Sequence, residues 1–344
     1  MEKSAQEVVL TVSSSPHVRC NESIPKIMWT VVATLVPAAA FGVYYFGFNA
    51  LLNIIVSIVS AVFFEWAWEK FMHKKITIND GSAVITGLLL AMCCSPILPW
   101  WMCIVGSFIA IVVCKQAMGG LGYNLFNPAH VGRAGLMVSW PVAMTTWTQV
   151  NGSVIDGVAG ATPLNVLKQS GYDALLQLFN SDPMTMYQNM FLGFRNGSMG
   201  ETSTVLLILG GLFLMYKGYV KWQATVAMIA TVGILMWVFG GAVGAHATGG
   251  LFTGDPIFHM MAGGLIIGAF FMSTDMVTAP ITLKGQLIFA VGAGVLTVLI
   301  RLLGGYPEGV CYSILLMNAV TPLIDLTVKP RIFGSVKVKA KEAE

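Results

Sequence analysis

The sequence predicts an all-α integral membrane protein with about ten transmembrane helices, in two inverted five-helix repeats with an extracytoplasmic loop between them. Three observations lead to this prediction: an apolar composition, a series of apolar runs, and a similarity between the two halves of the chain. Of the 344 residues, 56% are hydrophobic and only 10% are charged, and the mean hydropathy is +0.75. Soluble domains carry about 25% charged residues. Much of this apolar surface must therefore face lipid.

Ten apolar runs follow one another along the chain. A helix needs about 20 apolar residues to cross a bilayer, and most of the runs approach that length. The short or Gly-rich runs 83–95 and 257–274 are the exceptions. The first five runs lie near residues 27–47, 49–68, 83–95, 97–117 and 125–141, and the second five near 204–220, 222–245, 257–274, 286–303 and 308–325.

These runs divide the chain into five parts. The N-terminal part lacks the short apolar core and the cleavage site of a signal peptide. The parts are a cytoplasmic N-terminal segment (1–26), a first five-helix repeat (27–141), an extracytoplasmic segment (142–202), a second five-helix repeat (203–325) and a basic cytoplasmic tail (326–344).

The distribution of basic residues predicts the orientation. If the N-terminus is cytoplasmic, 15 of the 19 lysine and arginine residues fall on the cytoplasmic side. Only Lys168, Arg195 and Arg301 fall on the other side, and Arg133 falls inside a span. Basic residues concentrate in cytoplasmic loops of membrane proteins. Both termini are therefore expected inside, and the 142–202 segment outside.

The two halves of the chain resemble each other. Gly119-Gly120 precedes the segment with Asn127, and Gly304-Gly305 precedes the segment with Asn318. The two short runs also occupy corresponding places, and matching helices would cross the membrane in opposite directions. Inverted repeats commonly bring short or broken helices together near the midplane, where they line a site. Chance similarity between Gly- and Leu-rich helices is the alternative.

The most specific segment is DGVAGATPL at residues 156–164. Its glycines permit a tight turn, after which Thr162 is expected to cap a helix that begins with Pro163. A helix N-terminus is also an anion site, because its free backbone N–H groups and its dipole both favour negative charge. A phosphate attached to Thr162 would meet these groups.

This segment resembles the Asp-x-x-Ser/Thr-Gly-Ala-Thr signature at which bacterial flavin transferases attach FMN to threonine. Asp156, Gly160, Ala161 and Thr162 match it, whereas Ala159 stands where the family usually has Ser or Thr. Further segments resemble the RnfD subunit of the Rnf complex and, less closely, the related NqrB subunit of the sodium-pumping NADH:quinone reductase. They are SSPH at 14–17, NLFNPA at 124–129, STD at 273–275 and GGYPEG at 304–309.

The resemblance implies a membrane flavoprotein of the bacterial cytoplasmic (inner) membrane. It implies a covalent FMN, joined to Thr162 by a phosphoester on the extracytoplasmic side, and leaves a second, noncovalent flavin open. It implies electron transfer within a complex that couples ferredoxin/NAD chemistry to sodium or proton translocation. The implied partners are a second FMN-bearing subunit, iron–sulfur subunits and a flavin transferase, and the chain is not expected to be active alone. No G-x-G-x-x-G motif follows a strand, so nicotinamide chemistry belongs to a partner.

Arg133 and Asn127 are further candidates for cofactor contact. A charge within the membrane usually faces a cavity or a partner. Arg133 is therefore expected either to contact a flavin or an ion path, or to form a structural ion pair with Glu65, Asp275 or Glu308. Asn127 is expected either to contact a flavin or to make helix-packing hydrogen bonds.

Asp275 is a weaker candidate, for a sodium site. It follows Ser273 and Thr274, and three neighbouring oxygen groups could suit a sodium ion. The alternative is an aspartate that lies at the membrane interface. No other residues suggest a metal, because the six cysteines form no C-x-x-C pattern and have no ligand-spaced partners.

Other classes of function are less compatible with the sequence. No basic-aromatic patch indicates binding to nucleic acid. A channel or transporter for a small solute, without a redox role, is the alternative interpretation, since inverted repeats and sparse intramembrane charge suit it equally well.

Overall fold

The computed structural model describes residues 22–148, 159–179, 181–243, 249–306 and 308–330. Within these ranges the regular secondary structure is helical apart from one pair of two-residue strands. Asp156 lies outside the described residues, as do most of the N-terminal segment and of the C-terminal tail.

The first group of helices covers the expected first repeat. Ser23 caps its first helix, accepting a hydrogen bond from the Lys26 N–H at 3.4 Å. The group consists of α1 (Ile24–Phe46), α2 (Phe48–Phe71), η1 (Ile78–Asp80), α3 (Ser82–Met92), α4 (Trp100–Phe108), its π-helical continuation η2 (Ile109–Gln116), α5 (Pro128–Ser139) and α6 (Pro141–Thr145).

A middle group covers the predicted extracytoplasmic segment. Strands β1 (Trp147–Thr148) and β2 (Ala159–Gly160) pair antiparallel, with Trp147 opposite Gly160. The helices α7 (Pro163–Gln177) and α8 (Pro183–Leu192) and the 3₁₀ turn η3 (Met199–Glu201) follow. Helices α7 and α8 share a small apolar core with the Pro256–Met261 helix, which includes Leu164, Leu175, Met190 and Phe258.

The last group covers the expected second repeat. Its third span is broken, because the consecutive residues Gly263 and Gly264 both take positive φ, which interrupts the helix. The group consists of α9 (Thr204–Tyr216), α10 (Trp222–Phe239), α11 (Pro256–Met261), α12 (Leu265–Ile267), η4 (Gly268–Met272), α13 (Leu283–Leu303) and α14 (Val310–Thr327).

Five of the described helices are long and apolar enough to cross a membrane: α1, α2, α10, α13 and α14. Shorter apolar helices form α3, α4 with η2, and α9. The expected runs thus all contain helix, but several helices are shorter than the runs that predicted them. The run 222–245 yields the 18-residue α10. The run 125–141 yields the 12-residue α5, because Trp140 leaves the helical conformation before Pro141. The run 204–220 yields the 13-residue α9.

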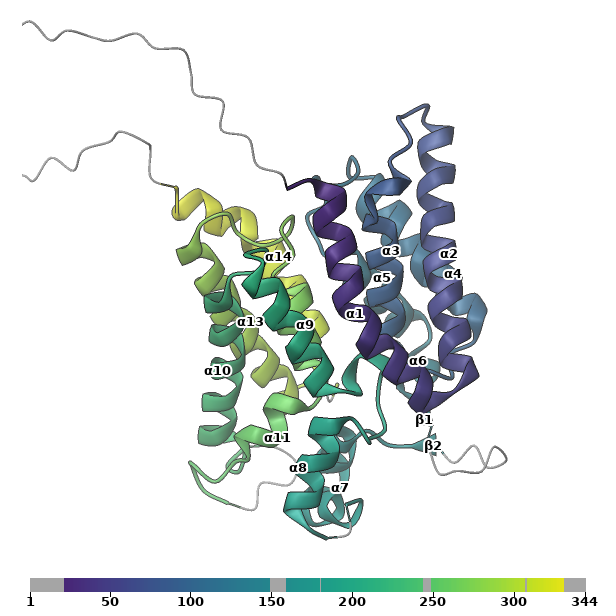
Figure 1. Ribbon diagram of the computed structural model, residues 1–344. Helices are drawn as coiled ribbons and strands as arrows, with labels where there is room; N and C mark the ends of the chain where they lie inside the picture. Colours follow the sequence, from purple (N-terminus) through teal and green to yellow (C-terminus); the bar gives the residue numbers. More distant parts are fainter. Residues whose placement is uncertain (1–21, 149–158, 180, 244–248, 307, 331–344) are drawn as a thin grey trace, which may run out of the picture.

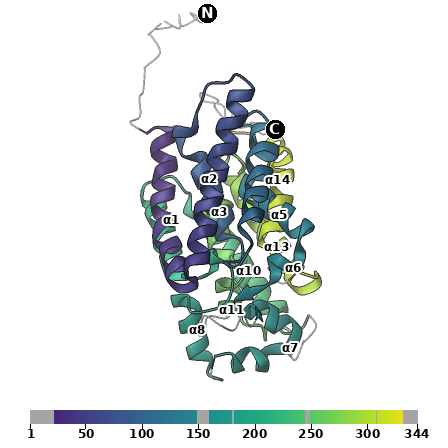
Figure 2. The same ribbon diagram turned by 90° about the vertical axis from the view of Figure 1, so that its right-hand side faces the viewer.

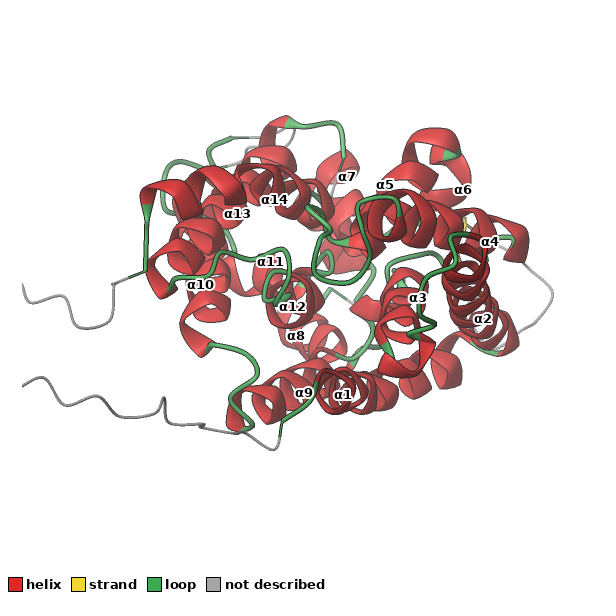
Figure 3. Cartoon of the chain, turned by 90° about the horizontal axis from the view of Figure 1, so that it is seen from above, coloured by secondary structure: helices red, strands yellow, loops and turns green. Residues whose placement is uncertain are grey.

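The helices form an elongated bundle with a small domain at one end. Helices α7 and α8 lie at the bottom of the bundle in Figure 1, and Figure 2 shows the same arrangement from the side. The start of α1 and the end of α14 both lie at the opposite end. Seen from above, α2 to α5 lie on one side and α10 to α14 on the other (Figure 3).

Glycines allow close helix contacts in the first group. A Cβ on Gly87 of α3 would lie 2.6 Å from the Ser57 carbonyl oxygen of α2, and a Cβ on Gly132 of α5 would lie 2.7 Å from the Gly106 carbonyl oxygen of α4. Small residues at these crossings let backbones approach in the absence of a hydrophobic driving force between helices.

The two short helices α3 and η4 end close together in the core. The thiol of Cys93, just after α3, lies 3.9 Å from the sulfur of Met272, the last residue of η4. The five described cysteines are all buried, and none of them forms a disulfide.

Candidate functional site

Thr162 begins α7 as its N-cap, as the sequence predicts. Its hydroxyl accepts a hydrogen bond from the Asn165 backbone N–H at 3.2 Å, and Pro163 occupies the first helical turn. Thr162 is 2% exposed, so this turn is closed over the hydroxyl. The backbone of Gly160 belongs to β2, and Ala161 is half-buried between the strand and the helix.

A cavity of about 260 Å³ lies beside α7, and its described lining does not include Thr162 itself. Asn165 and Gln169, three and seven residues after Thr162, share its helix face and contribute to the wall. The rest of the wall comes from α5, the segment around β1, and the residues that precede and begin α14. These are Arg133, Ala134, Met137, Thr145, Trp147, Gly305, Tyr306, Glu308, Gly309, Cys311 and Tyr312.

Arg133 forms an ion pair with Glu308 at the edge of this cavity. Both residues are 8% exposed. Of the three carboxylates considered from the sequence, Glu308 is thus the partner, whereas Glu65 and Asp275 are not. The Nε atom of Arg133 has no hydrogen-bond partner among the described residues, so the guanidinium is only partly satisfied.

Aromatic rings form another part of the wall. The rings of Tyr306 and Tyr312 stack, with their centroids 5.4 Å apart and their planes at 28°. Trp147, held by the strand pair, is 4% exposed. The cavity therefore combines aromatic surface, amide groups and one cation, which suits a flat, polar ring system.

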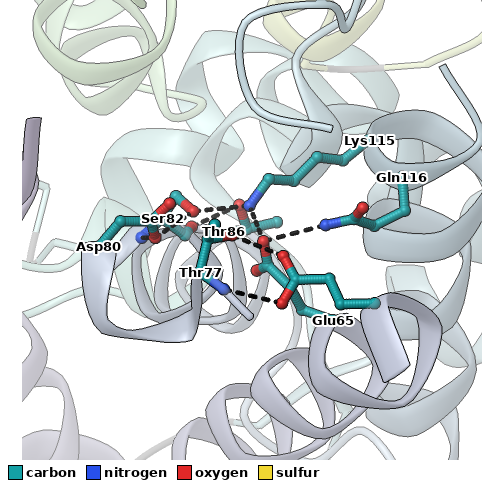
Figure 4. Close-up of polar contacts among 8 residues, drawn as sticks. Glu65, Thr77, Asp80, Ser82, Thr86, Lys115 and Gln116 are labelled. Carbon is teal, nitrogen blue, oxygen red and sulfur yellow. Dashed lines mark hydrogen bonds and ion pairs between the residues drawn. The ribbon is translucent and has the colours of Figure 1, made fainter. Parts of the chain in front are cut away.

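A buried polar cluster at the other end of the first group was missed by the sequence analysis (Figure 4). The Lys115 ammonium lies 2.7 Å from the Glu65 carboxylate and donates to the Ser82 hydroxyl at 2.6 Å. Gln116 also donates to Glu65, at 3.0 Å, and the Asp80 carboxylate accepts from the Ser82 hydroxyl at 2.6 Å.

Lys115, which closes the apolar run 97–117 and was counted with the basic residues of the cytoplasmic side, is not an exposed charge. It is 1% exposed in the last turn of η2, and Glu65 is fully buried on α2. One feature of the sequence could have indicated this cluster. Glu65 falls inside the apolar run 49–68, where a carboxylate without a partner would be costly. π-helical turns such as η2 occur frequently at functional sites.

Asn127 and Asp275 lie on a smaller cavity of about 100 Å³, which Lys115 also lines. Asn127 caps α5, and its side-chain oxygen accepts from the Ala129 N–H at 3.1 Å. The Asp275 carboxylate accepts from the Val277 N–H and the Thr278 hydroxyl within its own turn.

The hydroxyl groups considered with Asp275 for a sodium site both hydrogen-bond within their own helix. The hydroxyl groups of Ser273 and Thr274 donate back to carbonyl oxygens of η4, at 3.0 and 2.7 Å. Within the described part of the chain, no three His, Cys, Asp or Glu residues are grouped so that they could hold a metal ion.

Comparison with known proteins gives extensive matches. The profile of the NQR2, RnfD, RnfE family matches residues 11–334. The chain is 63% identical to the subunit designated D in the proton-translocating ferredoxin:NAD(+) oxidoreductase complex of Clostridium ljungdahlii, over 95% of this chain and 97% of that protein. It is 43% identical to the Na(+)-translocating counterpart of Acetobacterium woodii, over 98% and 99% of the two chains. It is also 38% identical to the corresponding subunit of the ion-translocating oxidoreductase complex of Stutzerimonas stutzeri, over 91% and 93%.

Proposed function

Because this chain belongs to the NQR2, RnfD, RnfE family, we propose that it passes electrons through an FMN attached to Thr162, as one subunit of an ion-translocating ferredoxin:NAD oxidoreductase complex. FMN, when bound, can accept and release one or two electrons, which is the redox chemistry that the side chains of this site lack.

The position of Thr162 on α7 carries the proposal. Thr162 shares a helix face with Asn165 and Gln169, which line the 260 Å³ cavity. A phosphate on the Thr162 hydroxyl would lie at the N-terminus of α7, where free backbone N–H groups favour an anion. A ring joined to that phosphate could enter the 260 Å³ cavity beside Asn165 and Gln169, whereas a second cavity of about 850 Å³ lies along Leu164, Leu167 and Lys168 of the same helix.

The residues of the cavity fit an isoalloxazine ring. Tyr306 and Tyr312 offer a stacked aromatic surface, and the Nε–H of Arg133 is an unused donor. Arg133 would stabilise added negative charge on the ring, whereas Glu308 limits that effect by neutralising part of the guanidinium charge. The Gln169 side chain donates to the Asn165 side-chain oxygen at 2.9 Å, so these two amides would orient the polar edge of the ring as a bonded pair.

The turn that buries the Thr162 hydroxyl limits when FMN could be attached to it. Ligand pockets commonly measure about 300–1,000 Å³, and this cavity of about 260 Å³ is below that range. The acceptor hydroxyl is also buried. We therefore expect the flavin transferase to act before the first turn of α7 closes, and the cavity walls to move apart around the ring.

A second, noncovalent flavin does not fit the smaller cavity in its present form. That cavity measures about 100 Å³, and the side-chain oxygen of Asn127 is already used as a helix cap. No step is therefore assigned to a second flavin.

We also propose the inverted-repeat arrangement and its orientation. In support, α3 and the α12–η4 helix are both short, both follow two longer helices, and end near each other at Cys93 and Met272. The basic residues favour cytoplasmic termini and place α7 and α8 outside the bacterial cytoplasmic membrane. The nicotinamide and iron–sulfur chemistry then belongs to partner subunits.

The proposal is tested by expressing the chain together with a flavin transferase. Thr162→Ala should abolish covalent flavin, measured by intact mass and by fluorescence of the denatured chain. Thr282→Ala is the matched control, since Thr282 caps α13 through the Gly285 N–H at 3.0 Å. The Thr282→Ala control also loses a threonine N-cap, but it should keep its covalent flavin. Covalent flavin that persists in Thr162→Ala would refute the assignment.

A further inference from the structure

Lys168 makes an unusual set of contacts two turns into α7. Its ammonium group donates to three backbone carbonyl oxygens: those of Arg301 and Tyr306, each at 3.2 Å, and that of Gly304. An ammonium group has three donor hydrogens. All of its donor capacity is therefore directed at one short stretch of main chain, more than 130 residues later in the sequence.

This stretch is the C-terminal end of α13 and the loop after it. Arg301 lies in the last turn of α13, and Gly304 is its C-cap. The last carbonyl groups of a helix lack intrahelical partners and carry the negative end of the dipole, so a cation there is favourable. No carboxylate lies within ion-pair distance of Lys168 among the described residues. Partial burial lowers the pKa of Lys168, because it disfavours the charged form.

The same loop forms one wall of the cavity proposed for the flavin. Gly305 and Tyr306 line the cavity from the loop, whereas Asn165 and Gln169 line it from α7. Lys168 connects these two walls through its three hydrogen bonds to the main chain. Loss of its three hydrogen bonds would let the loop, and with it the Tyr306 ring, move relative to the helix that begins at Thr162.

We propose that Lys168 is a positioning residue, which holds the helix bearing the flavin against the 304–306 loop and thereby sets the enclosure of the flavin ring. This inference rests on the proposed attachment of FMN to Thr162. It does not require Lys168 to touch the flavin, since Lys168 acts through the loop.

The stretch of main chain that Lys168 contacts is also hydrogen-bonded to the membrane part of the protein, through the Arg301 side chain. The Arg301 guanidinium donates to the carbonyl oxygens of His259 and Ala262, at 2.6 and 2.8 Å. These carbonyls lie at the end of α11, immediately before the Gly263-Gly264 break that starts the short helix α12. A displacement of α7 would thus reach both the cavity wall and the broken helix.

The test uses the full-length chain, co-expressed with a flavin transferase and purified in detergent. Lys168→Met removes the three donors but keeps the aliphatic length, and Lys168→Arg keeps charge and donors. Lys284→Met is the matched control, because Lys284 is exposed at the opposite end of α13. The measured quantities are covalent flavin per chain and the iodide quenching constant of the flavin fluorescence.

We expect Lys168→Met to carry a normal amount of covalent flavin, with a quenching constant that rises severalfold. Lys168→Arg should restore most of the protection, and Lys284→Met should match the wild type. Lys168→Gln serves as a second variant, expected to change quenching in the same direction, if the methionine variant accumulates poorly.

Three outcomes separate this inference from the proposed function. An unchanged quenching constant in a fully flavinylated Lys168→Met chain would overturn the positioning role. Failure of both the Met and Gln variants to accumulate would also overturn it, because Lys168 would then be needed for folding. Absence of covalent flavin from the wild-type chain would instead refute the proposed function.

Discussion

Arg133 on α5 forms an ion pair with Glu308, a residue 175 positions later that precedes α14. The pair joins helices from the two groups, because α5 packs against α14. Both side chains are largely removed from solvent. Removing one member of such a pair leaves a buried charge without compensation.

Arg133→Leu should therefore lower the amount of folded protein, because Glu308 loses its counter-charge at a cost of about 3–5 kcal/mol. The double variant Arg133→Leu with Glu308→Leu should recover most of the yield, since neither charge remains. Size-exclusion chromatography of a fluorescent fusion measures this. Equal yields for wild type and Arg133→Leu would show that the pair is not needed for stability.

The recovered double variant also tests a role in electron transfer. If Arg133 contacts the flavin, this variant should be flavinylated normally but transfer electrons slowly in the assembled complex. A double variant with wild-type turnover would restrict Arg133 to a structural role.

The Glu65–Lys115 pair should respond in the same way, at the other end of the bundle. Lys115→Met leaves the fully buried Glu65 with only the Gln116 donor, so we expect a loss of about 3–5 kcal/mol in stability. Adding Glu65→Leu should restore stability, as judged by the temperature of aggregation in detergent. Additive losses in the double variant would contradict the pairing.

Gly87→Ala tests the close contact between α2 and α3. A Cβ at this position would lie 2.6 Å from the Ser57 carbonyl oxygen and 2.8 Å from the Ile58 Cα. Both are backbone atoms, so the helices must separate, at about 1–3 kcal/mol. The temperature of aggregation should fall, whereas Gly250→Ala, where the added Cβ meets nothing within 4 Å, should leave it unchanged. Equal temperatures for the two variants would argue against the contact.

The sequence predicted the long helices well because each apolar run had a clear boundary. The run 286–303 became α13, and the run 308–325 became α14 with a shift of two residues. The broken span at 257–274 was recognised as irregular, but its division at Gly263-Gly264 depends on backbone conformations that no apolar pattern specifies.

Residue partners were harder to predict than helices. Three carboxylates were equally compatible with Arg133, because a choice among residues so distant in sequence needs the packing of α5 on α14. Lys115 closes an apolar run, where a lysine usually marks the membrane surface. Only the position of α2 shows that its side chain turns inward to Glu65.

The position of the two chain ends leads to a prediction about topology. The described chain begins and ends at one end of the bundle, and α7 and α8 lie at the other (Figure 1, Figure 2). We therefore expect one surface of the membrane to face the two ends of the described chain, and the opposite surface to face the proposed flavin segment. Because basic residues concentrate in cytoplasmic loops, their excess at this end predicts that it is the cytoplasmic one. Removing the buried Lys115 from the count leaves that excess in place.

Cysteines placed at two exposed positions test this orientation. Lys74 lies in the loop after α2, and Gln188 lies on α8. The five described native cysteines are at most 6% exposed, so an impermeant maleimide should not reach them, and only Cys20 needs to be replaced by serine. Labelling of Gln188→Cys is expected on intact spheroplasts, and labelling of Lys74→Cys only after permeabilisation. Both variants should label after solubilisation in detergent, which shows that both thiols can react. The reverse pattern on intact spheroplasts would place Thr162 in the cytoplasm, out of reach of an extracytoplasmic flavin transferase, and the proposed attachment would then have to be abandoned.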